Sequence, residues 1–167
     1  DVALELFGRR PLAEIARPEN DLTPDLRSDV AMKSVHRRQL MAMQRNVDGL
    51  LGNVDTEFLH DFRVAVRRTR SALAQVPEVF PKAVTERFRR GFSWLGKATG
   101  PLRDLDVYLL SLPRYAAGLP EELRPALAPI DRYLRRQHRL EHRRIVATLG
   151  TSRYRQTIEG WAEFLDR

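Results

Sequence analysis

The stretch that decides the fold and the chemistry of this chain is His60-Asp61-Phe62-Arg63-Val64-Ala65-Val66-Arg67-Arg68-Thr69-Arg70. On a helix that turns by about 100° per residue, four of its cationic side chains share a sector roughly 80° wide. They are His60, Arg63, Arg67 and Arg70. The adjacent sector is apolar and holds Phe58, Leu59, Phe62, Val66, Thr69 and Leu73. The cations therefore lie beside the buried face, and such a row of guanidinium groups suits an extended polyanion better than a single carboxylate.

The composition indicates one folded, basic domain. The 167 residues are 43% hydrophobic and 31% charged, with a formal net charge of +7. A chain of this length buries roughly 70% of the surface of its unfolded state. Lysine supplies only Lys33, Lys82 and Lys97 among the 29 basic residues. Arginine therefore dominates, and its planar fork suits phosphate oxygens, so we expect anionic partners.

Several classes of protein are excluded or disfavoured. The chain has no cysteine, so it has neither disulfides nor thiolate metal sites. No apolar run approaches the roughly 20 residues of a membrane span, and no signal peptide is visible, so we expect a cytoplasmic protein without a membrane partner. No nucleophile elbow, glycine-rich phosphate loop or zinc-type histidine spacing is present. We therefore expect no catalysis, no cofactor and no metal site.

The hydrophobic periodicity predicts an all-α fold. Residues 1–20 are expected to be a leader or linker with a short helical piece at 2–16, and residues 21–167 a helical bundle domain. Asp55 and Ser152 are expected caps, and Pro113 an expected stop. Short connections up to residue 112 favour an antiparallel bundle with a four-helix core and one or two further helices. The predicted helices span 24–50, 55–75, 81–98, 101–112, 125 or 129 to 149, and 152–167.

Some packing details also follow from the pattern. Gly91 and Gly96 are unfavourable inside a helix by roughly 0.5–1 kcal/mol each relative to alanine, so we expect a neighbouring helix to press close to both. Trp161 and Leu165 are candidate anchors of the last helix. The inward residues expected on the helix at 101–112 are Leu102, Leu105, Leu109 and Leu112.

A second basic row lies on the helix that ends at residue 149. Its cations share a sector about 120° wide beside an apolar face. A solvated helix face would explain one such row, but two rows favour a shared basic groove or pore, since crowded like charges repel without a counter-charge. We expect no exposed aromatic residue beside either row, which disfavours stacking of nucleic-acid bases. The row consists of Arg132, Arg135, Arg136, Arg139, His142 and Arg143.

The histidines and the acidic pair Asp104 and Asp106 allow more than one interpretation. A lone histidine is more often structural, but His60 shares a face with arginines and can donate a hydrogen bond to a phosphate oxygen. His36 and His138 lie on apolar faces and are expected at the core or its edge, whereas His142 could be either kind. Asp104 can simply complement the helix dipole, and Arg103 can pair with Asp106 at i+3. Alternatively, the two acids orient arginines from neighbouring helices, which we favour over direct contact with an anion.

These motifs together carry a family resemblance. The His60-x-x-Arg63-Val64-x-x-Arg67-Arg68-x-Arg70 motif is followed by Trp94-Leu95-Gly96 and by Leu102-Arg103-Asp104-x-Asp106-Val107. In this order they resemble the CHAD domain, the conserved histidine α-helical domain, and the chain corresponds to the N-terminal part of one. The resemblance implies an all-helical fold of two related four-helix bundles. It also implies a basic surface that binds inorganic polyphosphate, often in proteins associated with polyphosphate granules.

The resemblance also suggests which residues bind and what accompanies the domain. The first motif implies polyphosphate contacts for His60, Arg63, Arg67, Arg68 and Arg70, and the second implies one for Arg103, with Asp104 and Asp106 supporting them. Many members follow a CYTH triphosphatase domain, so residues 1–20 could be the tail of one. The family usually has a second half that does not fit into this chain, so we expect either a fragment or two copies that pair. Weaker candidates are Lys33, Arg37, Lys97, Arg135, Arg136, Arg139 and Arg143.

The sequence therefore predicts a non-catalytic polyphosphate-binding domain. The alternatives are a nucleic-acid-binding helical module and an accessory domain of an enzyme that acts on phosphoanhydrides. Replacement of Arg63 and Arg67 by alanine is expected to weaken binding and to leave helicity and melting unchanged.

Overall fold

The computed structural model of the protein describes residues 23–167. This part contains no strand, and the all-helical prediction is confirmed. The leader or linker expected at 1–20, with its short helical piece, lies outside the described residues, and the domain boundary near residue 21 stays a prediction. The helices are α3 (Ser28–Leu51), α4 (Thr56–Gln75), α5 (Lys82–Ala98), α6 (Gly100–Ala117), the 3-10 helix η1 (Glu121–Leu127), α7 (Ala128–Leu149) and α8 (Ser152–Asp166).

The helix starts show where capping signals act. Asp55 caps α4 as predicted, because its Oδ1 accepts the Glu57 backbone N–H at 2.8 Å. The cap of α8 is Thr151, one residue before the predicted Ser152, and its Oγ1 accepts the Tyr154 N–H at 3.3 Å. The first long helix begins at Ser28 rather than near residue 24. The cause is a turn at 23–26, which the Leu26 N–H closes on the Thr23 carbonyl at 3.1 Å.

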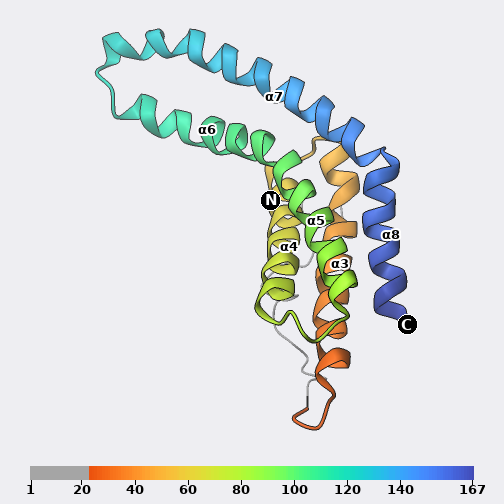
Figure 1. Ribbon diagram of the computed structural model, residues 1–167. Coiled ribbons are helices and arrows are strands. Elements are labelled where there is room, and N and C mark those ends of the chain that lie inside the picture. The colour runs from red at the N-terminus through yellow and green to blue at the C-terminus, as the bar shows by residue number, and fades with distance from the viewer. Residues whose placement is uncertain (1–22) are drawn as a thin grey trace.

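Four helices, α3, α4, α5 and α8, lie side by side around one apolar core (Figure 1). Its centre is Trp161 of α8, which is fully buried, with ring centroids 4.6 Å from Phe88 and 5.9 Å from Phe92. Leu165 is also fully buried, so both predicted anchors of the last helix are confirmed. Large aromatic side chains bury about 150–250 Å² each and dominate core energetics. The core therefore packs α5 against α8.

Two glycines in α5 allow this close packing. A Cβ at Gly91 would lie 2.8 Å from Thr157 Cγ2 of α8, which is below normal contact distance. A Cβ at Gly96 would lie 3.2 Å from Arg70 Nη1 of α4. The expectation that neighbouring helices press close to both glycines is confirmed, and at Gly96 the neighbour is a guanidinium group.

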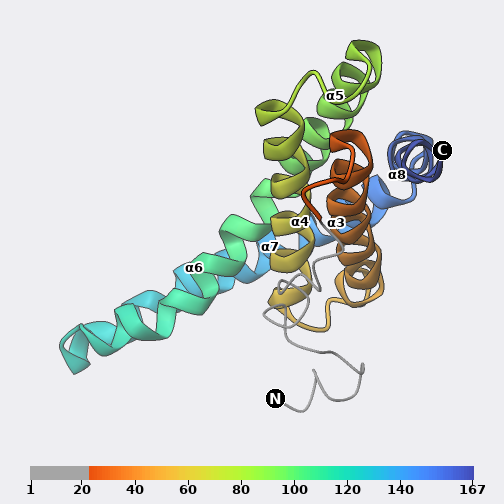
Figure 2. The same ribbon diagram turned by 90° about the horizontal axis from the view of Figure 1, so that it is seen from below.

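The pair α6 and α7 projects from this core as a helical hairpin whose far end is closed by η1 (Figure 1), and the view turned by 90° shows the same arm (Figure 2). We call this unit the α6–α7 hairpin. It begins abruptly, because α6 starts directly after Thr99, the residue that ends α5. Leu102 is buried at the base of the hairpin. The other expected inward residues of α6 are only half-buried, because this helix packs mainly on α7.

The expected stop at Pro113 is wrong, because α6 continues through this proline to Ala117. Proline removes one backbone N–H donor and crowds the carbonyl four residues earlier, which normally ends or kinks a helix. Pro113 lies in the projecting hairpin and is exposed, so water can satisfy the released carbonyl there. The antiparallel bundle expected from the short connections up to residue 112 therefore does not include α6 in its core, because this helix leaves the core and packs on α7.

Candidate functional site

The basic row of α4 lies beside the core as the sequence indicates. Phe58, Leu59, Phe62, Val66, Thr69 and Leu73 are buried, and they form the apolar face of the helix. Next to them, His60 and Arg63 are half-buried, whereas Arg67, Arg68 and Arg70 are exposed. Local helix periodicity is sufficient to place these side chains, because all of them belong to one element.

Arg63 has a structural role in this row. Its Nη1 donates hydrogen bonds to the Gly96 carbonyl and to Thr99 Oγ1, each at 2.8 Å. Burial lowers the pKa of the Arg63 guanidinium from its ordinary value, and the nearby carboxylate of Asp104 partly opposes this shift. Arg63 therefore ties α4 to the junction between α5 and α6, where the hairpin begins.

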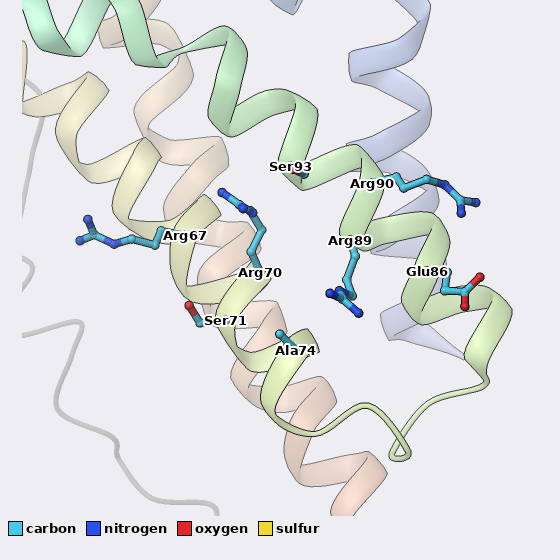
Figure 3. Close-up of a pocket in the computed structure, with 8 residues that line it drawn as sticks. All are labelled: Arg67, Arg70, Ser71, Ala74, Glu86, Arg89, Arg90 and Ser93. Atoms are coloured by element: carbon cyan, nitrogen blue, oxygen red, sulfur yellow. The ribbon is translucent and has the colours of Figure 1, made fainter.

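A cavity of about 540 Å³ opens between α4 and α5. Figure 3 shows that Arg70 of α4 and Arg89 of α5 extend into the gap from opposite helices, whereas Arg67 and Arg90 point outward on its two sides. Within residues 23–167, none of these four arginines forms a salt bridge. We call this feature the α4–α5 cavity. It is lined by Arg67, Arg70, Ser71, Ala74, Glu86, Arg89, Arg90 and Ser93.

Two lining residues were missed by the sequence interpretation. Arg89 and Arg90 precede Gly91 on α5, a helix on which the sequence indicated Lys97 as the candidate cation. The position of Arg89 was a usable signal, because it lies about 100° round the helix from Phe88, beside the apolar face of α5, as the cations of α4 lie beside theirs.

Several predicted residues lie elsewhere. On α3, Arg37 Nε donates to Asp166 Oδ1 at 3.3 Å and its Nη2 donates to the Leu165 carbonyl, so this arginine faces α8. Lys33 also faces α8, with its Nζ 5.3 Å from the centroid of the Phe164 ring. Lys97 is exposed in the last turn of α5. None of these side chains lines the α4–α5 cavity.

The second basic row follows the α6–α7 hairpin. Arg135 forms an ion pair with Asp131, with Nε and Oδ2 2.8 Å apart, and Arg136, Arg139 and Arg143 are exposed. The row does not line the α4–α5 cavity, whose residues all come from α4 and α5. The helix that joins the α4 row at a cavity is thus α5, where the sequence suggested α7.

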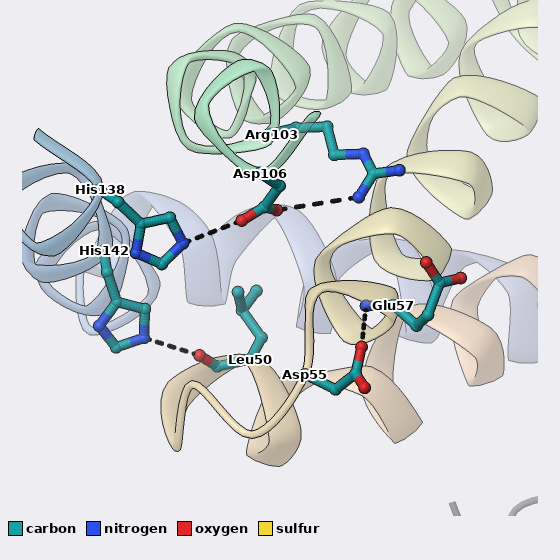
Figure 4. Close-up of polar contacts among 7 residues, drawn as sticks. All are labelled: Leu50, Asp55, Glu57, Arg103, Asp106, His138 and His142. Atoms are coloured by element: carbon teal, nitrogen blue, oxygen red, sulfur yellow. Dashed lines mark hydrogen bonds and ion pairs between the residues drawn. The ribbon is translucent and has the colours of Figure 1, made fainter. Parts of the chain in front are cut away.

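The base of the hairpin is held by a buried carboxylate (Figure 4). Asp106 is only 2% exposed; its Oδ1 lies 2.9 Å from His138 Nε2 of α7, and its Oδ2 lies 3.9 Å from Arg103 Nη1. Burial raises the pKa of Asp106 above its ordinary value, and the hydrogen bond with His138 and the charge of Arg103 oppose this shift. The predicted pairing of Arg103 with Asp106 is present. The partner from a neighbouring helix, however, is a histidine, whereas the sequence suggested an arginine.

The remaining histidines have different roles. His142 Nε2 donates to the Leu50 carbonyl at 2.9 Å and so joins α7 to the end of α3. His36 is fully buried, with its ring centroid 5.0 Å from that of Trp161, and burial lowers its pKa to about 4. Its expected core position is confirmed. His138 is half-buried, as expected for the edge of the core.

One group of side chains has the composition of a metal site. Glu57, His60 and Asp61 place possible ligand atoms within 4.8 Å of one another, and no other such group occurs in the described part of the chain. Glu57 is exposed at the first turn of α4, where an acid also complements the helix dipole. This arrangement alone does not indicate a bound cation.

Comparison with known proteins gives one result beyond the geometry. The model of the CHAD domain family matches residues 34–167, which is most of the chain. No curated protein matches the sequence. Among residues 23–167, no helix is both long and apolar enough to cross a membrane.

Proposed function

The chain belongs to the CHAD domain family, and from this premise we propose that it binds inorganic polyphosphate on the basic surface of α4 and α5, without catalysis. The supporting observation is the α4–α5 cavity, into which Arg70 and Arg89 extend from two helices. The proposed site consists of this cavity together with the exposed cations of α4.

The chemistry of the ligand follows from the arginines. A guanidinium group offers parallel N–H donors that match two oxygens of one phosphate. Arg63, Arg67 and Arg70 are spread over roughly 10 Å of helix at about 1.5 Å per residue, so a linear anion can contact several positions in turn. Arg63 already donates to Gly96 and Thr99 through Nη1, so its contribution to binding is mainly its charge. A repeating phosphate chain supplies negative groups along the whole row.

The lining also contains Glu86, an acid among arginines. Figure 3 shows its carboxylate at the outer side of α5, away from Arg70 and Arg89. The inner part of the cavity therefore keeps its positive charge, and an anion that enters between the two helices avoids the carboxylate.

Nucleic acid is the second candidate, and one observation favours it. The sequence suggested no exposed aromatic residue beside the basic rows, but Tyr133 is exposed on α7 and borders the second row, about 60° round the helix from Arg136. An exposed ring beside arginines can stack on a base. The α4 row has no such neighbour among its cavity-lining residues, so polyphosphate remains the preferred ligand at that site.

A competition experiment tests the proposal. Labelled long-chain polyphosphate is titrated with the full chain at several salt concentrations, and unlabelled polyphosphate, single-stranded DNA, RNA and ATP are added as competitors. We expect polyphosphate to compete best, and log K to fall linearly with log salt because bound counterions are released. Equal displacement by DNA of matched charge would contradict the preferred ligand. Release of orthophosphate in the presence of Mg²⁺ would contradict the absence of catalysis.

A further inference from the structure

Most exposed apolar side chains lie on the α6–α7 hairpin. It carries nine of the fourteen large apolar residues that are exposed among residues 23–167. Three of them are tyrosines, Tyr108, Tyr115 and Tyr133, with exposed fractions of 58%, 63% and 61%. A soluble helix normally exposes scattered apolar residues singly, so a concentration on one projecting unit marks a contact surface.

Five of these nine residues, Tyr108, Tyr115, Ile130, Tyr133 and Leu140, fall on one side of the hairpin, whereas Val107, Leu110 and Val146 point away from it and Leu123 belongs to η1. On α6, Tyr108 and Tyr115 are two helical turns apart and lie roughly 90° round from the leucines that face α7. On α7, the residues 130, 133, 137 and 140 have the i, i+3, i+7, i+10 spacing of a packing stripe. This stripe is rotated by roughly 100° about the helix axis from the side of α7 that faces α6, in the same sense as the two tyrosines on α6. Because the helices run antiparallel, equal rotations in the same sense reach the same side. This aromatic face consists of Tyr108, Tyr115, Ile130, Tyr133, Gln137 and Leu140.

The basic row of α7 lies on the other side of the hairpin. Its arginines are rotated in the opposite sense from the face that contacts α6, by roughly 130°. A partner on the aromatic face would therefore leave Arg136, Arg139 and Arg143 exposed. The two surfaces can be occupied independently.

We propose that a second copy of this chain covers the aromatic face, so that two α6–α7 hairpins pack face to face, antiparallel, as a four-helix bundle with a two-fold axis near Gln137. Arg144 continues the stripe at i+14, and the extended stripe is centred on Gln137, since Ile130 and Arg144 lie seven positions to either side. Tyr133 of one copy then packs near Leu140 of the other, and the two Gln137 amides meet at the axis. A single polar residue in an apolar seam fixes register and orientation in paired helices.

Charge and shape favour this partner. The base of the stripe carries Arg144, which is exposed and forms an ion pair with Glu141 of the same helix, and the tip of the hairpin carries the exposed acids Glu121 and Glu122 together with Arg124. Antiparallel pairing brings the tip of each copy to the base of the other, so Glu121 and Glu122 approach the partner's Arg144, whose exposed guanidinium has further donors besides the one that Glu141 engages. The same arrangement keeps the two compact helical cores at opposite ends of the new bundle.

The buried area is adequate for a specific dimer. The five apolar side chains of the aromatic face expose roughly 500 Å² together, on the basis of about 150–250 Å² for each large ring. A standard interface buries about 800 Å² on each partner, and flanking residues supply the remainder. We therefore expect a dimer that forms at micromolar concentration and dissociates on dilution.

The first test measures the mass of the full chain by sedimentation equilibrium from low to high micromolar concentration. We expect a monomer–dimer equilibrium, and we expect Tyr133→Glu with Leu140→Glu to weaken it by roughly a hundredfold, because both charges would be buried in the seam. The control carries the same charge change on the opposite side of α6, Val107→Glu with Leu110→Glu, and should still dimerise. Equal helicity of both variants by circular dichroism separates dissociation from unfolding. A monomer at every concentration would overturn the proposal and indicate a different occupant of this face.

The second test uses the absence of cysteine in the chain. Packed helices lie about 8–10 Å apart, so a short bis-maleimide should join two copies of Gln137→Cys across the axis. Arg139→Cys, on the basic side of the same helix, should not be joined. Cross-linking of both variants to the same extent, or of neither, would overturn the proposed axis.

Discussion

Replacement of Arg70 and Arg89 by glutamine removes both guanidinium groups that extend into the α4–α5 cavity. A hydrogen bond to a charged group contributes about 1.5–3 kcal/mol, and screening at an exposed site reduces this to about 1 kcal/mol per arginine. The double variant should therefore lose about 2 kcal/mol of binding free energy for polyphosphate, or roughly 30-fold in affinity. Because two phosphate contacts are lost, the plot of log K against log salt should also become less steep, with a slope smaller in magnitude by about 1.5.

The assay is titration of labelled polyphosphate at four or more salt concentrations, with a matched control. Arg27→Gln with Arg124→Gln removes the same charge from the start of α3 and from η1, and neither residue lines the cavity. We expect this control to lose only the small part of the binding free energy that depends on the net charge of the protein. If both double variants lost affinity equally, binding would depend on overall charge, and the cavity would not be the site. Unchanged binding by the cavity variant would refute the assignment directly.

Three further predictions concern stability. His36 is buried and neutral, and its pKa is about 4, against 6.5 when the side chain is exposed. As the pH falls, the histidine of the unfolded chain is therefore protonated before that of the folded chain. From pH 7 to pH 4.5 the free energy of unfolding should drop by about 2.5 kcal/mol because of this residue alone. Urea unfolding of the wild type and of His36→Leu checks this; an equal pH dependence in the two would exclude it. Gly91→Ala should destabilise the fold by about 1 kcal/mol in thermal melting, since its Cβ would meet Thr157, whereas Gly118→Ala should be tolerated because its Cβ meets only ordinary contacts. Asp106→Ala should leave His138 without its partner and speed amide hydrogen exchange in α6 and α7 by roughly tenfold or more, with the exchange of α3 unchanged; faster exchange throughout the chain would mean that the effect is global.

The sequence predicts well those features of the structure that depend on residues within a single helix. The placement of Arg67 beside the buried Val66 follows from the turn of α4 alone, and the Asp55 cap follows from chemistry within one turn. The close approaches at Gly91 and Gly96 could also be predicted, because glycine inside a helix needs a reason in packing. In each case the controlling interactions lie within a few residues of the signal.

What the sequence does not predict is which helices meet. The contact between Asp106 and His138 joins residues that are 32 positions apart, and periodicity says only that each lies near an apolar face. For the same reason, the sequence did not indicate that Arg70 of α4 and Arg89 of α5 extend into one cavity. Pro113 misled the prediction for a different reason, since a proline stops a helix only where its lost hydrogen bond cannot be replaced by water.

The arginines of the motif on α4 have different roles, as Arg63 shows. On the helical wheel it is equivalent to Arg67 and Arg70, and the sequence suggested that replacing Arg63 together with Arg67 by alanine would leave helicity and melting unchanged. In the structure its Nη1 satisfies the Gly96 carbonyl and Thr99 Oγ1 at the point where α5 gives way to α6, and the charges of Arg103 and Asp104 act on it there. Its removal would take the guanidinium donor away from the Gly96 carbonyl and from Thr99 Oγ1, so a loss of binding by that variant would combine a lost cation with a displaced α4. Arg70 and Arg89, which carry no such bonds among the described residues, are therefore the residues on which a test of anion binding has to rest.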